Sequence, residues 1–324
     1  MPQETINEAT ARSEVVDQTP EFSAIITSYF EENSLPEFYR RLSSALESLG
    51  RTYEIIFVND GSLDKTFDVM VGILEQDSHV YTVIDLFKNS GQLAAMTAGL
   101  THARGAVFLF MDSDLQLDPE ELPLLVAEYD LGRDVVSGCR RDRKDSSTRV
   151  IPSKLANVIM RRVSRTQFKD FGCTFKLYNA KLIRAFAFGP HKLFNTAAVI
   201  SKAQHCAEVP VTHHPRRFGQ SGWTFAKLWD FNMENIVRLF ERPFQSLALI
   251  SVVFAVLFGV RIAVDYLTPF RILPAVSSGL LLNVLVITFL ITVGALCLIG
   301  EFTIRAFISS QKEPSYIIRR MVRR

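Results

Sequence analysis

Four short, nearly continuous apolar stretches alternate with segments of helical pattern, and this alternation constrains the fold more than any other feature. The stretches predict strands over residues 23–27, 53–59, 81–87 and 106–111. Between them, the segments 35–49, 63–76 and 92–103 repeat apolar residues at helical spacing. Strands that alternate with helices form a parallel sheet covered on both faces. We therefore expect an α/β domain, to which residues 134–138 add a further strand.

Polar residues follow three of these strands at the point where each strand ends. They are Tyr29 and Glu31 after the first strand, Asp60 after the second, and Asp112 and Asp114 after the strand at 106–111. In parallel sheets the ligand crevice lies beyond the carboxyl ends of the strands. We therefore expect these side chains to meet at one site.

The two carboxylates after the last of these strands predict a site for a hard divalent cation. Asp112 and Asp114 are one residue apart, and Gln116 follows them. Mg²⁺ or Mn²⁺ held by one or two carboxylates keeps positions open for water and phosphate oxygens, so such an ion can bridge a protein and a diphosphate. The alternative is a capped turn, because Asp118 and Pro119 also have the pattern of a helix start.

Asp60 and Lys88 have both structural and functional interpretations. The sequence Asn-Asp-Gly-Ser at residues 59–62 is typical of a turn and a helix cap. A carboxylate at Asp60 can also accept hydrogen bonds from a nucleotide base. Lys88 precedes the helix predicted at 92–103, whose first backbone N–H groups suit an anionic ligand. Helix capping alone explains that segment as well.

Two long uncharged apolar runs predict a membrane hairpin toward the C-terminal end. Residues 244–260 carry no charge, the apolar run continues past Arg261 to Leu267, and a second uncharged run covers residues 272–300. Each run is long enough to cross a hydrocarbon core of about 30 Å as a helix. The short connector between them predicts that the chain returns to the side it left. Two buried helices of a soluble protein are the alternative, which the lengths disfavour.

Basic residues flank this hairpin on both sides. They are Lys227, Arg238, Arg242, Arg305, Lys312, Arg319, Arg320, Arg323 and Arg324. The positive-inside rule then predicts an integral membrane protein with two spans, whose catalytic domain and both termini are cytoplasmic. The cysteines have no metal-ligand spacing, which argues against zinc and disulfides and agrees with a reducing compartment.

Changes in composition divide the chain into five parts. Residues 1–20 are polar, without apolar periodicity, and predict a flexible N-terminal tail. The soluble domain is expected over residues 21–222, the transmembrane hairpin over 244–300 and a basic cytoplasmic tail over 301–324. Residues 223–243 mix aromatic, aliphatic and charged side chains and predict a juxtamembrane amphipathic helix in the headgroup layer. Ordinary packing of this helix on the domain is the alternative.

Three histidines and a cysteine near residue 210 do not predict a metal site. Residues 208–212 have the pattern of a strand, in which alternate side chains face opposite ways, and this separates His213 from His214. We expect a structural role for these two residues and for His205 and Cys206.

The order of these motifs resembles the inverting family 2 glycosyltransferases of the GT-A type. Within that family it resembles the polyprenyl-phosphate glycosyltransferases, such as dolichyl-phosphate mannose synthases and bacterial undecaprenyl-phosphate glucosyltransferases. The resemblance covers roughly residues 22–225. It implies a GT-A fold, which is a Rossmann-like and mostly parallel sheet, followed here by the two-helix transmembrane hairpin. The nucleotide-sugar contacts it implies are Thr27, Tyr29, Glu31, Asp60, Lys88, Asp112 and Arg216, and the metal ligands are Asp112, Asp114 and Gln116.

The resemblance also implies a lipid-phosphate subsite. Arg149 and Ser153 match an Arg-xxx-Ser pair that the family places on the lipid phosphate, and Arg140 and Arg143 are expected beside them. Asp170 begins an acidic turn, Asp-Phe-Gly-Cys, near the acceptor, where it either orients a substrate or acts as a general base. The expected catalytic residues are Asp114, Asp170, Arg149 and Ser153. For the arginines, a solvated basic face against anionic lipid headgroups is the alternative.

The chain departs from the family pattern at two places. The first motif usually reads Pro-x-Tyr-Asn-Glu, but Thr27 and Phe30 replace the Pro and the Asn. The loop expected to close over the donor, Arg-Arg-Phe-Gly-Gln-Ser at residues 216–221, lacks the Lys-Tyr pair that commonly follows it. The cationic role of that pair then passes to Arg216 or Arg217.

The function implied is that of a hexosyltransferase acting on a polyprenyl phosphate. It moves one sugar, with inversion and with Mg²⁺ or Mn²⁺, from UDP-glucose to undecaprenyl phosphate at the cytoplasmic membrane face. A formyl-aminoarabinose or GDP-mannose donor is one alternative, and a catalytically silent sugar-nucleotide sensor or membrane scaffold is another. A processive polysaccharide synthase is disfavoured, because the chain has no Gln-x-x-Arg-Trp motif. The expected partners are the UDP-sugar donor, the polyprenyl phosphate acceptor, the lipid bilayer and other copies of the chain in a homo-oligomer such as a tetramer. Nucleic acid is not among them.

Overall fold

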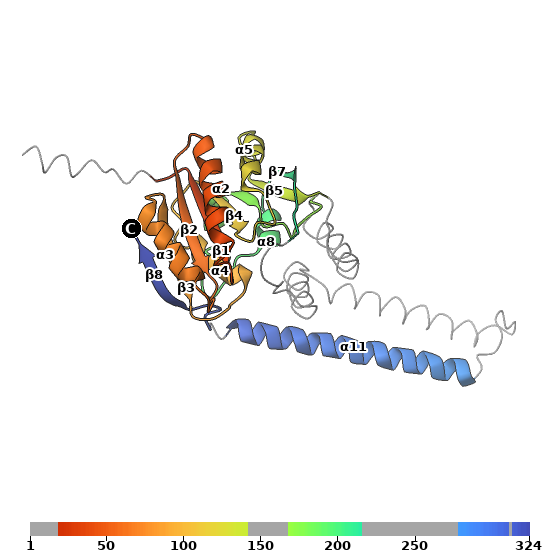
Figure 1. Ribbon diagram of the computed structural model, residues 1–324. Coiled ribbons are helices and arrows are strands. Elements are labelled where there is room, and N and C mark those ends of the chain that lie inside the picture. The colour runs from red at the N-terminus through yellow and green to blue at the C-terminus, as the bar shows by residue number, and fades with distance from the viewer. Residues whose placement is uncertain (1–18, 142–167, 216–277, 311–312) are drawn as a thin grey trace, which may run out of the picture. The chain divides into compact units, whose positions relative to one another are not determined.

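A computed structural model describes residues 19–141, 168–215, 278–310 and 313–324 (Figure 1). The chain divides into two compact units, of which the first comprises residues 1–232 and 314–324 and the second residues 233–313. The first unit contains an eight-stranded sheet with the strand order β7-β5-β6-β4-β1-β2-β3-β8. The strands of this sheet and their adjoining loops carry the predicted site residues that the structure describes.

Four parallel strands form the centre of the sheet, and they are the four strands that the apolar stretches predict. Their bounds are β1 (Phe22–Ser28), β2 (Tyr53–Asn59), β3 (Val80–Leu86) and β4 (Val107–Asp112). β1 lies between β4 and β2 and pairs in parallel with both. Nearly every residue of these strands is buried, as expected for a sheet covered on both faces.

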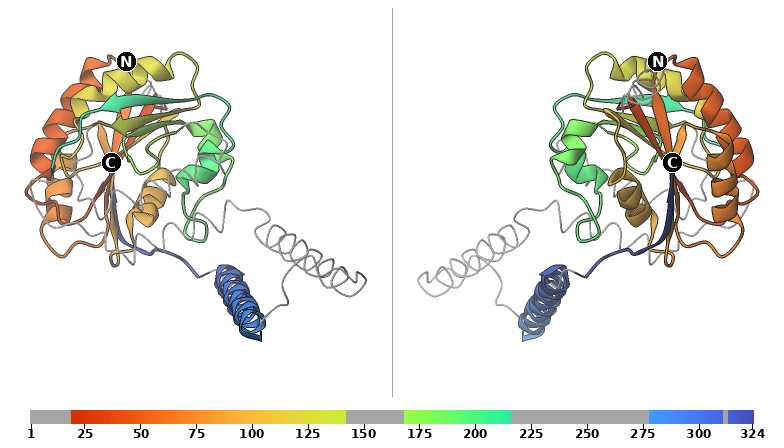
Figure 2. Two further views of the ribbon diagram at one scale, coloured as in Figure 1. Left: turned by 90° about the vertical axis from the view of Figure 1, so that its right-hand side faces the viewer. Right: turned by 90° about the vertical axis from the view of Figure 1, so that its left-hand side faces the viewer.

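Helices cover both faces of the sheet, as the two views in Figure 2 show. On one face lie α2 (Leu35–Ser48), α3 (Thr66–Gln76) and α5 (Leu122–Tyr129), the last preceded by a short 3₁₀ helix, η1 (Pro119–Glu121). On the other face lie α4 (Gln92–Leu100), α7 (Ala180–Arg184) and α8 (Thr196–Ile200). Ala24 and Ile25, neighbours on β1, belong to different core clusters, because successive side chains of a strand face opposite ways.

The remaining strands make the sheet mixed. β5 (Val135–Arg140) pairs in parallel with β7 (Cys206–Val211), whereas β6 (Lys176–Asn179) is antiparallel to both β5 and β4. Four of the seven pairings are parallel and three are antiparallel. The predicted α/β class and the strand predicted at 134–138 are confirmed, and the sheet contains more antiparallel pairing than expected.

The eighth strand comes from the C-terminal end of the chain. β8 (Ile318–Arg323) is antiparallel to β3, and its register places Arg320 opposite Asp85. The composition of residues 301–324 predicts a basic tail here and does not predict the strand. Half of its residues are arginines and most of its side chains are exposed, and the segment lacks the alternation of apolar and polar residues by which strands are found.

The second unit contributes one described helix, α11 (Ser278–Ser310). It begins within the second predicted span. Within the part of the chain that the structure describes, no helix combines the length and the apolar character that crossing a membrane requires. The first predicted span and the juxtamembrane helix at residues 223–243 lie outside the described residues. The two-span hairpin therefore stays a prediction.

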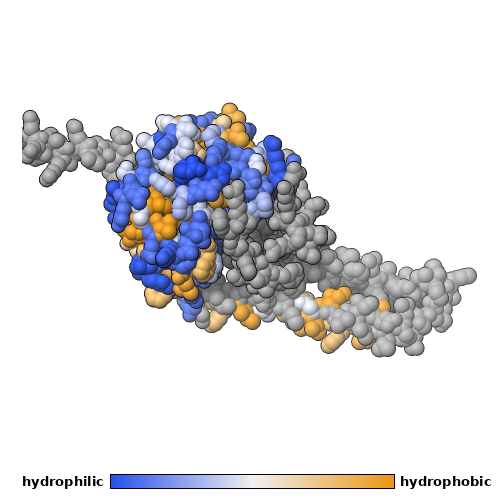
Figure 3. All heavy atoms as spheres, in the orientation of Figure 1, coloured by the Kyte–Doolittle hydropathy of each residue, from blue (hydrophilic) through white to orange (hydrophobic). Residues whose placement is uncertain are grey.

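The described surface differs between the two units. Hydrophilic residues cover most of the face of the first unit that Figure 3 shows. On α11, large apolar side chains that are exposed recur along the helix, among them Leu285, Phe289, Leu296 and Phe307.

Candidate active site

Asp112 is the last residue of β4, and its carboxylate is held by two neighbouring elements. Thr27 of β1 donates from Oγ1 to Oδ1 over 2.7 Å. Nε2 of Gln92, the first residue of α4, lies 2.8 Å from Oδ1 and 2.7 Å from Oδ2. Burial and, secondly, the nearby charge of Asp114 raise the pKa of Asp112. A cation at this position would therefore offset an electrostatic cost.

Asp114 lies in the turn after β4 and is 9% exposed. Its Oδ1 accepts the backbone N–H of Gln116 over 3.1 Å, which is a local bond of the kind that the capped-turn alternative expects. Leu115, between them, is buried and has a φ of +57°, a left-handed conformation that is unusual for a large side chain. Such a backbone persists only where the surrounding packing fixes it. The left-handed backbone at Leu115 therefore fixes the relative directions of Asp114 and Gln116.

The donor set at this turn fits a divalent cation that keeps part of its water shell. Among the described residues, no group of three or more His, Cys, Asp and Glu side chains is placed to hold a metal ion. Two carboxylates and the amide oxygen of Gln116 instead match Mg²⁺ or Mn²⁺, which retain water and phosphate oxygens as ligands. The Gln116 Nε2 atom lies 3.5 Å from the carbonyl oxygen of His214, so the amide oxygen faces away from that carbonyl.

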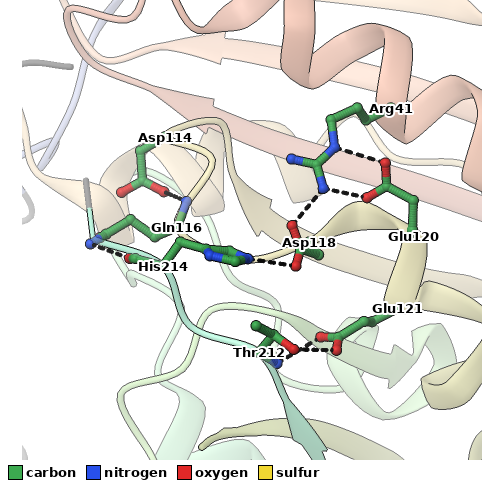
Figure 4. Close-up of polar contacts among 8 residues, drawn as sticks. All are labelled: Arg41, Asp114, Gln116, Asp118, Glu120, Glu121, Thr212 and His214. Carbon is green, nitrogen blue, oxygen red and sulfur yellow. Dashed lines mark hydrogen bonds and ion pairs between the residues drawn. The ribbon is translucent and has the colours of Figure 1, made fainter. Parts of the chain in front are cut away.

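A network of ion pairs and hydrogen bonds connects this turn to α2 and to the segment after β7 (Figure 4). Asp118 accepts a hydrogen bond from Arg41 of α2, and Nε2 of His214 lies 2.7 Å from its Oδ2. Arg41 also donates from Nε to Glu120 over 2.7 Å. The backbone N–H of His214 donates to the carbonyl of Gln116 over 2.8 Å. His214 thus has the structural role that the sequence predicts, but next to the candidate metal turn.

The charges of this network perturb its carboxylates. Burial alone would raise the pKa of Asp118, but hydrogen bonds from Arg41 and His214 outweigh it and lower that pKa. The hydrogen bond from Arg41 likewise lowers the pKa of Glu120. Both carboxyl groups are therefore held in the ionised form, which keeps the network intact at neutral pH.

Asp60, directly after β2, holds the loop that precedes α4. Its Oδ1 accepts the backbone N–H of Ser90 over 2.7 Å, and its Oδ2 accepts the backbone N–H of Gly91 over 3.0 Å and Nδ2 of Asn89 over 3.1 Å. Asp60 is buried. These bonds give it a structural role in closing the loop. Its contact with a nucleotide base stays a prediction.

The loops after β1 and β2 are joined to each other. The backbone N–H of Phe30 donates to Oγ of Ser62 over 3.0 Å, and that of Glu31 donates to Oγ1 of Thr66 over 2.9 Å. Glu31 is buried, and its carboxylate accepts a hydrogen bond from the hydroxyl of Ser34. The predicted nucleotide residues of both loops therefore belong to one connected region at the carboxyl ends of the strands.

Exposed side chains lie on the loop after β1 and on the loop between β3 and α4. The rings of Tyr29 and Phe30 meet edge-on with their centroids 4.6 Å apart, and Lys88 is exposed. Phe30 has a φ of +57°, a conformation that the Asn of the family pattern adopts more readily than Phe. Gly61 has a φ of +68°, and a Cβ there would overlap the backbone of Lys88, so the loop after β2 touches the loop after β3.

Two residues predicted for the acceptor side, Arg140 and Asp170, form a bidentate pair. Nε of Arg140 lies 2.7 Å from Oδ2 of Asp170, and Nη2 lies 2.8 Å from Oδ1. Asp170 is 6% exposed. Glu208 of β7 accepts the backbone N–H groups of Lys169 and Asp170 over 2.8 Å and 2.9 Å. The structure thus brings these two predicted residues together and fixes the backbone on which Asp170 sits.

Lys176, on β6, holds the rest of the turn that begins at Asp170. It is buried, and its Nζ donates to the carbonyl of Phe171 over 3.2 Å and to the carbonyl of Cys173. Burial lowers the pKa of Lys176 and raises the pKa of the Cys173 thiol to about 11. The turn is therefore held by two side chains, Arg140 through the carboxylate of Asp170 and Lys176 through the carbonyls of Phe171 and Cys173.

Other predicted site residues lie outside the described residues. They are Arg143, Arg149 and Ser153 of the lipid-phosphate subsite and Arg216 with Arg217 of the donor loop. Their roles stay predictions.

The model of the family described as Glycosyl transferase family 2 matches residues 23–189, more than half of the 324 residues. The matched region runs from β1 through β6 and includes Asp60, Asp112, Asp114 and Asp170. The chain belongs to glycosyl transferase family 2. The predictions of an enzyme and of this family are confirmed.

This glycosyltransferase is similar over most of its length to two proteins of the same name. It is 36% identical over 237 residues to the undecaprenyl-phosphate 4-deoxy-4-formamido-L-arabinose transferase of Salmonella paratyphi B, an alignment that covers 72% of each chain. The protein of that name from Salmonella newport shows the same identity and coverage.

Solved structures show the fold of the glycosyltransferase. A crystal structure of glucosyl-3-phosphoglycerate synthase from Mycobacterium tuberculosis, in complex with Mn²⁺ and uridine-diphosphate-glucose, matches with a TM-score of 0.50 at 17% identity. The match covers 75% of this chain and 84% of that one. A complex of the same enzyme with Mn²⁺, uridine diphosphate and glucosyl-3-phosphoglycerate gives a TM-score of 0.51 at 17% identity, with 75% and 85% coverage. The expected GT-A-like α/β fold is thereby confirmed, with a mixed sheet.

Sequence reasoning missed several residues that hold the site. Gln92 could have been found, because it is the first residue of a helix that begins at the carboxyl edge of the sheet. Arg41 is 77 residues away from Asp118 in the chain, and no local pattern reveals such a pair. Lys176 lies within a strand too short to give a periodic signal.

Proposed function

We propose that this glycosyltransferase transfers one sugar from a UDP-sugar to undecaprenyl phosphate. The observation that carries the proposal is the 36% identity, over 72% of the chain, to transferases named for undecaprenyl phosphate. The site supports it. The acidic pair Asp112 and Asp114 lies at the carboxyl edge of the sheet, as does the loop held by Asp60. This is where α/β sheets bind nucleotides.

The donor that we propose is the UDP derivative of 4-deoxy-4-formamido-L-arabinose, the sugar in the name of the relatives. UDP-glucose, which the motifs alone imply, ranks second, and GDP-mannose third. The two leading sugars differ chemically. The arabinose derivative carries a formamide at C4 and lacks the hydroxymethyl group of glucose, so a site that hydrogen-bonds the formamide would discriminate against glucose.

We also propose that Asp112, Asp114 and Gln116 hold a divalent cation. When bound, the ion supplies Lewis-acid stabilisation of the departing nucleoside diphosphate. The buried, mutually repelling carboxylates support this assignment, as does a glycosyltransferase of similar fold that was crystallised with Mn²⁺. Mg²⁺ and Mn²⁺ both suit an all-oxygen donor set.

The side chains of the acceptor side have to bring two anions together. The lipid phosphate is already an anion at neutral pH, so its oxygen can attack the anomeric carbon with little deprotonation, and in-line attack inverts that carbon. Arg143, Arg149 and Ser153 would bind the lipid phosphate through charge-assisted hydrogen bonds. Because both oxygens of Asp170 accept from Arg140, we assign Asp170 to orienting the acceptor side rather than to removing a proton.

We propose that the enzyme acts at the cytoplasmic face of the membrane as an integral protein with two spans. The uncharged runs at 244–260 and 272–300 support this location, and so do the exposed apolar side chains on α11. The flanking basic residues support cytoplasmic termini and a cytoplasmic catalytic domain. A homo-oligomer such as a tetramer is proposed with it, and mass measurement of the detergent-purified protein tests that proposal.

The deciding experiment is a transfer assay with the purified full-length protein. It combines a polyprenyl phosphate, Mg²⁺ or Mn²⁺, and a panel of labelled nucleotide sugars. We expect transfer from the UDP-formamidoarabinose donor and much less from UDP-glucose. Efficient transfer from UDP-glucose alone would restore glucose as the donor.

The control is the Asp114→Asn variant, which should insert into the membrane normally and transfer no sugar. Loss of transfer in this variant shows that the activity of the wild type belongs to this site. A wild-type protein that binds UDP-sugars but transfers none of them would refute the proposed reaction and indicate a sensor.

A further inference from the structure

Asp85, on β3, is a buried carboxylate that connects β2 to the C-terminal strand. It is 1% exposed. Its Oδ1 accepts a hydrogen bond from Nδ2 of Asn59, the last residue of β2, over 2.8 Å. Its Oδ2 accepts from Nε of Arg320 on β8 over 3.1 Å and lies 3.0 Å from Nη2 of the same side chain. One carboxylate oxygen therefore serves each neighbouring strand.

The bond from Asn59 determines how the following turn closes. An ionised carboxylate only accepts hydrogen bonds, so the amide of Asn59 must direct its NH₂ group toward Asp85. The amide oxygen then faces the turn, where it accepts the backbone N–H of Ser62 over 3.3 Å. Asp60 lies inside this turn. Asp85 therefore selects the one orientation of the Asn59 amide in which its oxygen can accept the hydrogen bond from Ser62 that closes the turn.

Arg320 supplies the opposite charge that lets this carboxylate remain buried. Its guanidinium lies over the ring of Phe67 on α3, 4.0 Å from the centroid. Its side chain is 53% exposed, whereas that of Asp85 is 1% exposed. Arg319 provides a second and more distant cation, with Nη1 at 3.8 Å from Oδ2. A residue 235 positions away in the chain thus supports the turn that follows β2.

We propose that Asp85 and Arg320 are positioning residues for the donor nucleotide, acting through Asn59 on the turn that carries Asp60. The inference rests on the proposed function in taking residues 59–62 as part of the UDP subsite. Neither residue needs to touch the substrate. The C-terminal strand thereby becomes part of the support of the donor site.

The test compares two arginines of the same strand. Arg320→Gln removes the cation that faces Asp85. Arg323→Gln is the matched control, because Arg323 also lies on β8 but contacts His102 and the ring of Tyr81. Calorimetry measures the binding of UDP with Mg²⁺ to the purified full-length protein. The transfer assay measures KM for the UDP-sugar and for the polyprenyl phosphate.

We expect Arg320→Gln to weaken UDP binding and to raise KM for the UDP-sugar, each about tenfold, a change of about 1.4 kcal/mol. KM for the polyprenyl phosphate should stay within about twofold, since the acceptor subsite has its own supports in Glu208 and Lys176. Arg323→Gln should change none of the three constants. Arg320→Lys, which retains the charge, should recover most of the loss.

A purely structural role would give a different pattern. The proposal is overturned if Arg320→Gln lowers the melting temperature but binds UDP as the wild type does, or if KM rises equally for both substrates. Should Arg320→Gln fail to fold, the double variant Asp85→Asn with Arg320→Gln takes its place, because it leaves no buried charge without a partner. The amide that Asp85→Asn introduces can present an NH₂ group to Asn59, so we still expect weakened UDP binding. UDP affinity equal to that of the wild type would overturn the proposal.

The binding measurement separates this inference from the proposed reaction. A wild-type protein that binds UDP but moves no sugar refutes the reaction, and weaker UDP binding by Arg320→Gln in that protein still supports the positioning role. An active enzyme whose UDP affinity is unchanged by Arg320→Gln refutes only the positioning role.

Discussion

Gly61→Ala, which adds a single methyl group, should lower both the stability of the protein and its affinity for UDP. The φ of +68° at Gly61 is left-handed, and a Cβ there would overlap the carbonyl carbon of Lys88 and lie 2.6 Å from the backbone nitrogen of Asn89. Both atoms are backbone atoms, so no side-chain rotation relieves the contact. The loop that would move is the one that Asp60 holds through Ser90.

The size of the effect follows from two separate costs. Placing alanine in the left-handed region costs about 1–2 kcal/mol, and forcing apart packed backbone costs about 1–3 kcal/mol more. Gly50 provides the matched control, because it has a φ of +62° and nothing lies within 4 Å of the position of its Cβ. Gly50→Ala should therefore show the first cost alone.

The assay is thermal or urea unfolding of the full-length protein, monitored by circular dichroism. UDP affinity is measured in parallel. We expect Gly61→Ala to be less stable than Gly50→Ala by about 1–3 kcal/mol and to bind UDP at least about tenfold more weakly. Equal destabilisation by the two substitutions, with unchanged UDP affinity in both, would refute the close approach of the two loops as the reason for this glycine.

Four further predictions concern single residues. Asp114→Asn should lower kcat by at least about 100-fold while leaving the fold intact, because it removes a charged ligand of the proposed cation. The transfer rate is measured over a range of Mg²⁺ and Mn²⁺ concentrations. Transfer at the wild-type rate would contradict the proposal that Asp114 holds a metal ion. Phe30→Asn should stabilise the protein by about 0.5–1 kcal/mol in thermal unfolding, since Asn tolerates a positive φ better than Phe. A lower melting temperature would show that the contacts of the Phe30 ring stabilise the protein by more than its positive φ destabilises it. The hydrogen bonds of Arg41 lower the pKa of both of its carboxylate partners, so their contribution is present above the ordinary carboxyl range and is lost as pH falls through the lowered pKa values. Arg41→Gln should therefore cost about 1 kcal/mol of unfolding free energy at pH 7 and progressively less as pH falls through the lowered pKa values of Asp118 and Glu120. A loss independent of pH would contradict this. Arg149→Ala should raise KM for the lipid phosphate more than KM for the UDP-sugar, and the reverse result would mean that the two subsites are assigned the wrong way round.

The centre of the sheet could be predicted because its strands are buried on both faces. A strand of that kind is a continuous apolar run, so β1 to β4 were recognisable, and β2 was predicted with its observed bounds, Tyr53–Asn59. Strands with a polar face or few residues give no such run. β6 has four residues, including the buried Lys176, and half of the residues of β8 are arginines. Their pairing depends on long-range contacts that no local window contains.

The candidate site shows the same division. The positions of Asp60, Asp112 and Asp114 follow from the rule that the ends of parallel strands meet at one edge, and the structure places them there. Gln92, a partner of Asp112, could have been found from its place at the start of a helix, but the long-range partners around the site follow from no local pattern. The pairing of Asp85 with Arg320 joins residues 235 positions apart, and only the folded sheet brings them together.

The position of β8 also decides how a soluble version of this enzyme should be built. Because β8 pairs along β3, a fragment that stops before the apolar region would leave unpaired the N–H and C=O groups of β3 that face β8. Such an exposed strand edge favours strand addition between molecules. Fragments of that kind should aggregate. Deleting the apolar region but joining residues 314–324 back through a flexible linker should keep the domain monodisperse.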